Sequence, residues 1–145
     1  MSISPRLAEV VAALPVQPHH RVLEVGCGPG AAARAVADRL DTGHILAIDR
    51  SATAIRQVSE NSVEQIRAGL LSARRVAIED FVLEQDEEPF DLVFAIRVGA
   101  LDGRHPRAGR AALERIVAAT RPGARLFVDG GNPLRELPLR RIPGE

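Results

Sequence analysis

Hydrophobic residues along this chain occur in short continuous runs, and stretches with a helical period lie between the runs. The runs are of strand length and carry few polar residues, as expected for strands buried on both faces. The predicted strands are Arg21–Val25, His44–Ile48, Arg75–Ile78, Asp91–Ile96 and Arg125–Val128. The predicted helices are Leu7–Leu14, with Ser4 and Pro5 as cap and first turn, Ala31–Leu40, Ala52–Leu71 and Ala108–Thr120. The alternation predicts an α/β fold with a parallel sheet and right-handed crossovers.

Length and composition indicate one domain spanning residues 1–145. Of these residues 46% are hydrophobic, which is enough for a core. The formal net charge is zero, so no overall charge attracts the chain to nucleic acid or to an anionic membrane. No apolar run approaches the roughly 20 residues that span a bilayer. Met1–Pro5 lacks the pattern of a signal peptide.

Two features of the composition suggest where the protein works. Cys27 is the only cysteine, so no intramolecular disulfide can form and a reducing cytoplasm is the expected compartment. All 19 basic residues are arginine. Together with the abundant alanine, this bias is typical of a GC-rich bacterial genome. We therefore expect a bacterial cytoplasmic protein.

A glycine-rich loop is the strongest local signal for a ligand site. The predicted strand Arg21–Val25 continues directly into Gly26-Cys27-Gly28-Pro29-Gly30, which opens the next predicted helix. Glycine permits tight turns and a close approach of ligand to backbone, and the start of a helix presents free N–H groups. Gly26, Gly28 and Ala31 also satisfy the dinucleotide fingerprint. The loop alone therefore leaves a nicotinamide cofactor open.

Three carboxylates near the predicted strand ends narrow the choice of ligand. Glu24 lies two residues before Gly26, where an acid could meet a ligand ammonium group. Asp49 closes the second strand, where a carboxylate accepts both hydroxyls of a ribose. Asp80 follows the third strand, where it could accept a hydrogen bond from an adenine amine. Open α/β sheets bind ligands at this edge, so the three acids favour an adenosyl ligand that carries an amino group.

These segments resemble the motifs of the class I S-adenosylmethionine-dependent methyltransferases. Val22–Gly30 (VLEVGCGPG) is similar to motif I of that family. Ala47–Ser51 is similar to the second motif, Glu79–Phe81 to the third and Phe90–Ala95 to the fourth. Arg121–Leu126 is similar to the turn that leads into the family's fifth strand. The resemblance covers residues 7 to 129. It implies a Rossmann-like doubly wound sheet of strand order 3-2-1-4-5, S-adenosylmethionine as cofactor with S-adenosylhomocysteine as product, and methyltransferase activity.

The resemblance also implies a role for each matching residue. The backbone from Gly26 to Gly30 would pass beneath the methionine portion of the cofactor, with Glu24 near its amine. Asp49 would bind the ribose and Asp80 the adenine amine. The predicted cofactor-binding residues are Glu24, Gly26, Cys27, Gly28, Gly30, Asp49, Arg50, Ser51, Asp80, Phe81, Ile96 and Arg97. Arg50 and Phe81 would flank the adenine, and Ile96 and Arg97 would lie near both the cofactor and the methyl acceptor.

The C-terminal part departs from the family. The family's sheet continues into a sixth and a seventh strand, whereas only residues 130–145 follow Asp129 here. We therefore expect these two strands to be missing. Prolines at 133, 138 and 143 favour an extended strap over a paired strand. The fifth strand, Arg125–Val128, would then be an exposed edge, and a symmetric homodimer that covers it is expected, with a strap within one chain as the alternative.

Residues that the chain lacks exclude several subclasses of the family. It has no tyrosine and no lysine, which excludes the usual exocyclic base-amine motif and the lysine-dependent ribose tetrad. One cysteine cannot support the two-cysteine cytosine mechanism. Neither an acidic pair for arginine methylation nor a carboxylate set for a metal follows the fourth strand, and no metal site is predicted. The elimination favours a small-molecule acceptor over nucleic acid, with a protein or an RNA acceptor still open.

No catalytic residue is fixed by the sequence. His105 is the best-placed potential base, with a solvated loop histidine as the alternative. Arg97 could bind an anionic acceptor or form a surface ion pair. Asp91 is expected to be structural, and Cys27 to be a packed residue rather than a nucleophile. Two other functions remain open. One is an NAD-dependent oxidoreductase, which Glu24, Asp80 and the lack of room for a catalytic domain oppose. The other is a non-catalytic adenosyl-ligand-binding or partner subunit.

Overall fold

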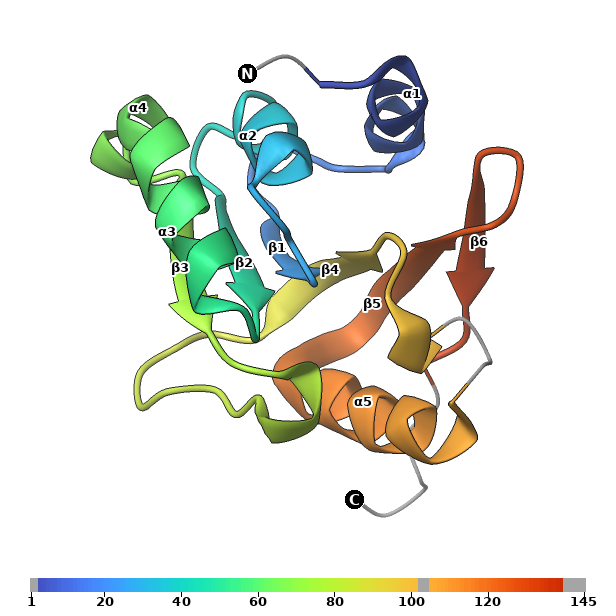
Figure 1. The fold of residues 1–145 in the computed structure, drawn as a ribbon. Coiled ribbons are helices and arrows are strands. Elements are labelled where there is room, and N and C mark those ends of the chain that lie inside the picture. The colour runs from blue at the N-terminus through green and yellow to red at the C-terminus, as the bar shows by residue number, and fades with distance from the viewer. Residues whose placement is uncertain (1–2, 102–104, 140–145) are drawn as a thin grey trace.

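The computed structural model describes residues 3–101 and 105–139, which form one six-stranded sheet with helices on both faces (Figure 1). The strands are β1 (Arg21–Val25), β2 (His44–Asp49), β3 (Leu71–Arg75), β4 (Phe90–Ala95), β5 (Thr120–Asp129) and β6 (Leu134–Leu137). The helices are α1 (Pro5–Ala13), α2 (Ala31–Ala37), α3 (Ala52–Asn61), α4 (Val63–Arg67) and α5 (Pro106–Ala119), with 3₁₀ turns η1 (Ile78–Asp80) and η2 (Gly99–Leu101).

The sheet has the strand order β3-β2-β1-β4-β5-β6, and the pairs from β3 to β5 are all parallel. The predicted order 3-2-1-4-5 is therefore confirmed. After β1 the chain moves outward to β2 and β3, and then returns to the other side of β1 as β4. The carboxyl ends of β1 and β4 consequently border the crevice at which doubly wound sheets bind ligands.

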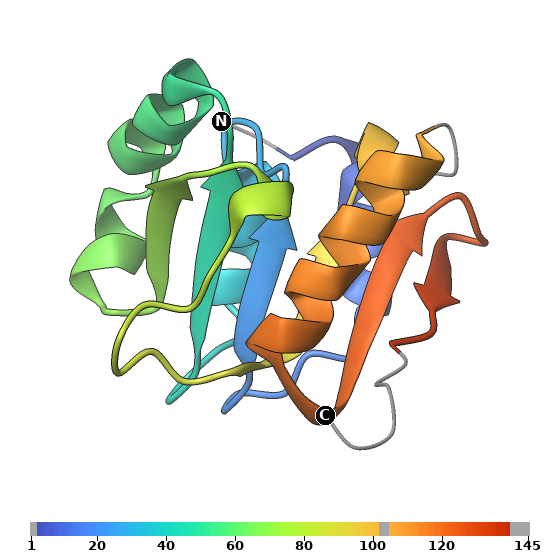
Figure 2. The same cartoon turned by 90° about the horizontal axis from the view of Figure 1, so that it is seen from below.

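Alternate residues of the strands build two cores, one on each face of the sheet. Val22, Ile45 and Leu92 face α1, α2 and α3, whereas their neighbours face the opposite way toward α5. Figure 2 shows α5 crossing one face of the sheet, with α1 on the other side. Because both faces are covered, β1, β2 and β4 are almost entirely buried. This explains why their sequences are continuous apolar runs.

Two predicted elements differ from the structure. The long helix predicted for residues 52–71 is interrupted at Ser62, whose backbone ends α3 and begins α4. The third strand is Leu71–Arg75 rather than Arg75–Ile78, because Leu71 pairs with Ile45 and Arg75 with Asp49. β3 lies at the edge of the sheet and is only partly buried. Its polar sequence therefore gave no apolar run to recognise.

The segment after β5 also differs from the prediction, since it forms a strand. Residues 134–137 pair antiparallel with β5, from Asp129 opposite Leu134 to Leu126 opposite Leu137. Pro133 and Pro138 flank this strand, so neither removes a hydrogen bond from its interior. The prediction that the sheet ends at the fifth strand was therefore wrong. In the described part of the chain, no helix is long and apolar enough to cross a membrane.

Candidate functional site

The glycine-rich loop lies at the carboxyl end of β1 and is tied to the end of β2. The N–H groups of Gly26 and Cys27 both donate to the carbonyl oxygen of Ile48, at 2.9 and 3.0 Å. Gly26 and Gly28 have positive φ angles of 70° and 53°. A Cβ atom at Gly26 would lie 2.7 Å from Cγ2 of Val98, whereas at Gly28 it would meet nothing within 4 Å. Packing therefore requires glycine at 26, and Gly28 faces open space.

Asp49 ends β2 beside this loop and holds it in place. Its Oδ2 accepts a hydrogen bond from the Gly28 N–H at 3.0 Å, and its Oδ1 accepts one from the Ser51 N–H at 2.9 Å. A carboxylate has about four acceptor positions, so these two bonds leave capacity for a ligand. Asp49 can thus position the loop and accept ligand hydroxyls at the same time.

Glu24 is buried in β1 below the loop and is 3% exposed. Its Oε1 has no hydrogen-bond partner. Burial, followed by repulsion from Asp49, raises the pKa of Glu24 to about 8, and Arg34 opposes the shift. The side chain is therefore mostly uncharged at neutral pH. A buried polar atom without a partner is costly, and such atoms are typical of functional sites.

Cys27 lies in the loop but behaves as a core residue. Its thiol is buried, and burial raises the pKa of Cys27 far above its usual range, with Glu24 and Asp49 adding to the effect. Because the thiolate is the nucleophilic form, Cys27 is inert at neutral pH. The expectation that it is a packed residue is confirmed.

Two cavities flank the loop, and both are bordered by Gly26 and Arg97. The smaller, of about 190 Å³, lies against α1 and is lined by Arg6, Glu24, Gly28 and Asp129, among other residues. The larger, of about 650 Å³, lies beyond β2 and is lined by Asp49, Arg50, Ile78, Glu79 and His105, among others. The predicted residues Cys27 and Ile96 border the smaller cavity. Most of the predicted cofactor-binding residues thus surround one continuous edge of the sheet.

Four predicted residues have other surroundings. Phe81 is 1% exposed and packs in the core, with Phe90 and the Arg74 guanidinium beside its ring. Asp80 is exposed, and its neighbour Glu79 lines the larger cavity instead. Ser51 caps α3 through its hydroxyl, and Gly30 is the N-cap of α2. The burial of Phe81 does not support a direct contact of its ring with adenine.

Arg97 and Asp129 form a contact that the sequence did not indicate. The N–H of Arg97 donates to Oδ1 of Asp129 at 3.0 Å, which joins the ends of β4 and β5. Arg97 has a φ of 59°, an uncommon value for a residue other than glycine. Within the described residues its guanidinium has no hydrogen bond or ion pair. The alternative of a surface ion pair therefore finds no partner in that part of the chain.

His105 and the start of α1 complete the site. His105 is exposed at the N-cap of α5 and lines the larger cavity, without a hydrogen bond to its ring from any described residue. Arg6 and Leu7 of α1 and its N-cap Ser4 line the smaller cavity, and sequence reasoning missed them. No group of three or more potential metal ligands is present among residues 3–101 and 105–139.

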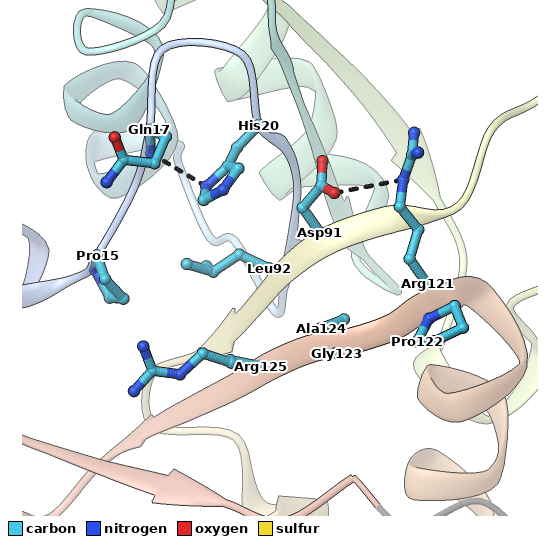
Figure 3. Close-up of a pocket in the computed structure, with 10 residues that line it drawn as sticks. All are labelled: Pro15, Gln17, His20, Asp91, Leu92, Arg121, Pro122, Gly123, Ala124 and Arg125. Carbon is cyan, nitrogen blue, oxygen red and sulfur yellow. Dashed lines mark hydrogen bonds and ion pairs between the residues drawn. The ribbon is translucent and has the colours of Figure 1, made fainter.

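A third cavity, of about 350 Å³, lies near the amino ends of β1, β4 and β5 (Figure 3). There Asp91 accepts the Arg21 N–H at 2.9 Å and pairs with Arg121 at 3.3 Å. His20 accepts the Gln17 N–H, and burial lowers the pKa of His20. These polar groups bind one another and join β1, β4 and β5. The structural role expected for Asp91 is confirmed.

Comparison with known proteins agrees with this fold. The family described as "Methyltransferase domain" matches residues 22–123. The chain therefore belongs to this family, and its fold is that of the class I S-adenosylmethionine-dependent methyltransferases. No curated protein matches the sequence.

Solved structures give the same result. A methyltransferase from Geobacter sulfurreducens, in complex with S-adenosyl-L-homocysteine, is 20% identical, with a TM-score of 0.67 over 87% of this chain and 48% of that protein. Coclaurine N-methyltransferase, bound to N-methylheliamine and S-adenosylhomocysteine, is 20% identical, with a TM-score of 0.68 over 84% of this chain and 34% of that one. The [4+2]-cyclase SpnF is 24% identical, with a TM-score of 0.68 over 85% and 43%. The chain spans about a third to a half of their lengths.

Proposed function

We propose that this chain binds S-adenosylmethionine and transfers its methyl group to a small molecule. The observation that carries the proposal is the pairing of two acids across one glycine-rich loop. Glu24 opens into the smaller cavity and lacks a hydrogen-bond partner, whereas Asp49 opens into the larger one. An amino group is the natural partner for the first acid, and a ribose diol for the second. The cofactor carries both groups.

The residues present fit this ligand from end to end. The smaller cavity would hold the amino-acid portion between Glu24 and Arg6, and Gly28 leaves room for the ligand above the loop. The larger cavity would hold the nucleoside beside Asp49, with Ile78 and Glu79 near the base. The Geobacter protein and coclaurine N-methyltransferase were crystallised with S-adenosylhomocysteine, which supports the same cofactor here.

When bound, the cofactor supplies an electrophilic methyl group on a sulfonium. The protein must align the acceptor with this methyl and exclude water. Since Gly26 and Arg97 border both cavities, the alignment would occur beside them. His105 lines the larger cavity and could accept a proton from the acceptor if the nucleophile needs a base. A small acceptor is favoured because the chain lacks the motifs of several nucleic-acid methyltransferase subclasses and the acidic pair of arginine methyltransferases.

The second possibility is a function other than methyl transfer, including a non-catalytic adenosyl-ligand-binding subunit. The fold does not fix the chemistry, because the [4+2]-cyclase SpnF has the same fold. The oxidoreductase alternative is weaker, because a buried acid such as Glu24 has no role toward a nicotinamide. The single cysteine and the absence of lysine beside 19 arginines support a bacterial cytoplasmic setting.

Calorimetry tests cofactor identity directly. We expect S-adenosylhomocysteine to bind in the micromolar range, about −8 kcal/mol. Asp49→Ala should weaken this binding by about 1–3 kcal/mol, because ribose hydroxyls would lose an acceptor. Asp38→Ala, at an exposed position on α2, is the matched control and should bind like the wild type. Tighter binding of NAD than of S-adenosylhomocysteine would exclude the proposal.

Methyl transfer separates the enzyme from the non-catalytic alternative. Radiolabelled S-adenosylmethionine would be offered with a panel of small hydroxy and amino compounds, and incorporation of label measured. We expect transfer to at least one class of compound. Cofactor binding without any transfer would favour the non-catalytic function.

A further inference from the structure

Three arginines line the two cavities that flank the glycine-rich loop. Arg6 lines the smaller cavity, Arg50 the larger and Arg97 both, and no described residue binds their guanidinium groups. By contrast, Arg39, Arg74 and Arg121 are held by backbone carbonyls or carboxylates. An arginine at the edge of a cavity, whose guanidinium forms no ion pair, is available to an anionic ligand.

Arg97 is the most constrained of the three. It follows β4 in a left-handed conformation, with φ of 59°, and its N–H is fixed by Oδ1 of Asp129. Backbone conformations of this kind are costly and persist where the surroundings enforce them, often at functional sites. The hydrogen bond to Asp129 therefore fixes where the Arg97 side chain leaves the backbone, between the two cavities.

The acids of the site do not neutralise this guanidinium. Glu24 is mostly uncharged in the free protein at neutral pH, because burial raises its pKa to about 8, and with the cofactor bound it would pair with the ligand ammonium. Asp49 and Asp129 accept backbone N–H groups, and neither forms an ion pair with Arg97. Arg6 lines the smaller cavity and not the larger one, so it is available to the carboxylate at the amino-acid end of the cofactor. Arg97 is then left for a second anion.

We propose that the methyl acceptor carries a carboxylate that Arg97 binds, and that Asp129 is the residue that positions Arg97. This inference rests on the proposed function, because it takes the cofactor to occupy the two cavities around Gly26. The anionic end of the acceptor would lie at Arg97, with its nucleophile directed toward the methyl group. Arg97 would thus select anionic over neutral small molecules.

Benzoate and benzamide are suitable probes because they share a shape and differ in charge. Their binding to the protein saturated with S-adenosylhomocysteine would be measured by ligand-observed NMR titration. We expect benzoate to bind in the millimolar range and benzamide at least about tenfold more weakly. Arg97→Gln should remove this preference, and should weaken benzoate binding by a larger factor than S-adenosylhomocysteine binding. Arg67→Gln, at an exposed position on α4, should retain the preference.

Asp129 variants test the positioning role. Asp129→Ala removes the acceptor for the Arg97 N–H and should reduce the preference for benzoate, whereas Asp129→Asn keeps an oxygen there and should restore it. Circular dichroism would check that each variant folds, and Arg97→Gln decides the proposal even if Asp129→Ala does not fold.

The possible failures are distinguishable. If the wild type does not bind S-adenosylhomocysteine, the proposed function fails and this inference fails with it. If it binds S-adenosylhomocysteine but shows no preference for benzoate, only this inference is overturned. If Arg97→Gln weakens the binding of S-adenosylhomocysteine and of benzoate by the same factor, Arg97 binds the cofactor instead. This result would also overturn the inference.

Discussion

Glu24 illustrates how a single buried residue can link ligand binding to pH. In the free protein its pKa is raised to about 8, so the side chain carries a proton at pH 7. An ammonium group placed beside it favours the carboxylate and lowers its pKa. Binding should therefore release a proton below pH 8, and S-adenosylhomocysteine should bind more tightly as the pH rises from 6 to 8. Above pH 8 Glu24 is already ionised in the free protein, so the affinity should no longer rise with pH through this residue.

Calorimetry in two buffers of different ionisation enthalpy at pH 7 measures the released proton. Glu24→Gln is the control, since it keeps the shape of the side chain but cannot titrate, and its binding should be weaker and release no proton from this site. Proton uptake by the wild type, or identical proton release by Glu24→Gln, would show that Glu24 does not meet the ligand ammonium.

The sequence predicted those site residues whose position follows from a strand end. Glu24 and Asp49 were identified because β1 and β2 are almost entirely buried and their limits are clear. Asp80 was assigned to the adenine because it follows the predicted third strand, Arg75–Ile78, whereas β3 ends at Arg75 and residues 78–80 form a 3₁₀ turn. Phe81 was assigned from the resemblance alone. The contact between Arg97 and Asp129 joins residues 32 positions apart. No local pattern contains such information.

At the scale of the elements, Gly28 in the loop between β1 and α2 can be compared with Gly69, which lies between α4 and β3. Gly28 and Gly69 both have positive φ, at 53° and 77°, and a Cβ at either would meet nothing within 4 Å. Valine at either position should therefore destabilise the fold by a similar amount, about 1–3 kcal/mol from backbone strain. Only at Gly28 would the new side chain enter the space assigned to the cofactor.

We expect Gly28→Val to lose S-adenosylhomocysteine binding by at least about tenfold, and Gly69→Val to bind like the wild type. Thermal unfolding of both variants measures the shared strain, and calorimetry measures the difference between them. Equal affinity of the two variants would mean that the ligand does not pass over Gly28.

Elements at the edge of the fold were the ones that sequence patterns missed. β3 is partly exposed and contains Arg74 and Arg75, so it lacks an apolar run. β6 has only four residues and lies between two prolines, which indicated an extended strap. The break at Ser62 depends on tertiary contacts, because the Ser62 hydroxyl accepts a hydrogen bond from Arg34 of α2. The sequence of a buried strand or helix shows a clear hydrophobic pattern, whereas the sequence of an element at the edge of the fold shows only a weak one.

For the whole molecule, β6 changes the reason to expect a dimer. That expectation required an exposed β5, but β6 covers this edge along Leu126–Asp129. The question is now whether two copies of β6 can pair with each other. The strand is short, is flanked by Pro133 and Pro138 and exposes Arg135 and Glu136. Short strands, prolines and charges are the features by which natural edges resist pairing.

The register of such a pair makes the resistance specific. Opposed residues in an antiparallel pair must point to the same face, so a two-fold axis perpendicular to the sheet can place Arg135 opposite its own copy or Glu136 opposite its own copy, but not Arg135 opposite Glu136. Either central register therefore opposes like charges, which is destabilising. We expect this chain to be monomeric at micromolar concentrations.

Light scattering at several protein concentrations measures this directly. The double variant Arg135→Thr with Glu136→Thr keeps a good strand former at both positions and removes the like-charge pairs. It should associate at concentrations at which the wild type stays monomeric, because only the short length of β6 and its flanking prolines would still oppose pairing. A wild-type dimer would contradict the expectation outright. A monomeric double variant would mean that the prolines and the short strand prevent pairing without help from the charges.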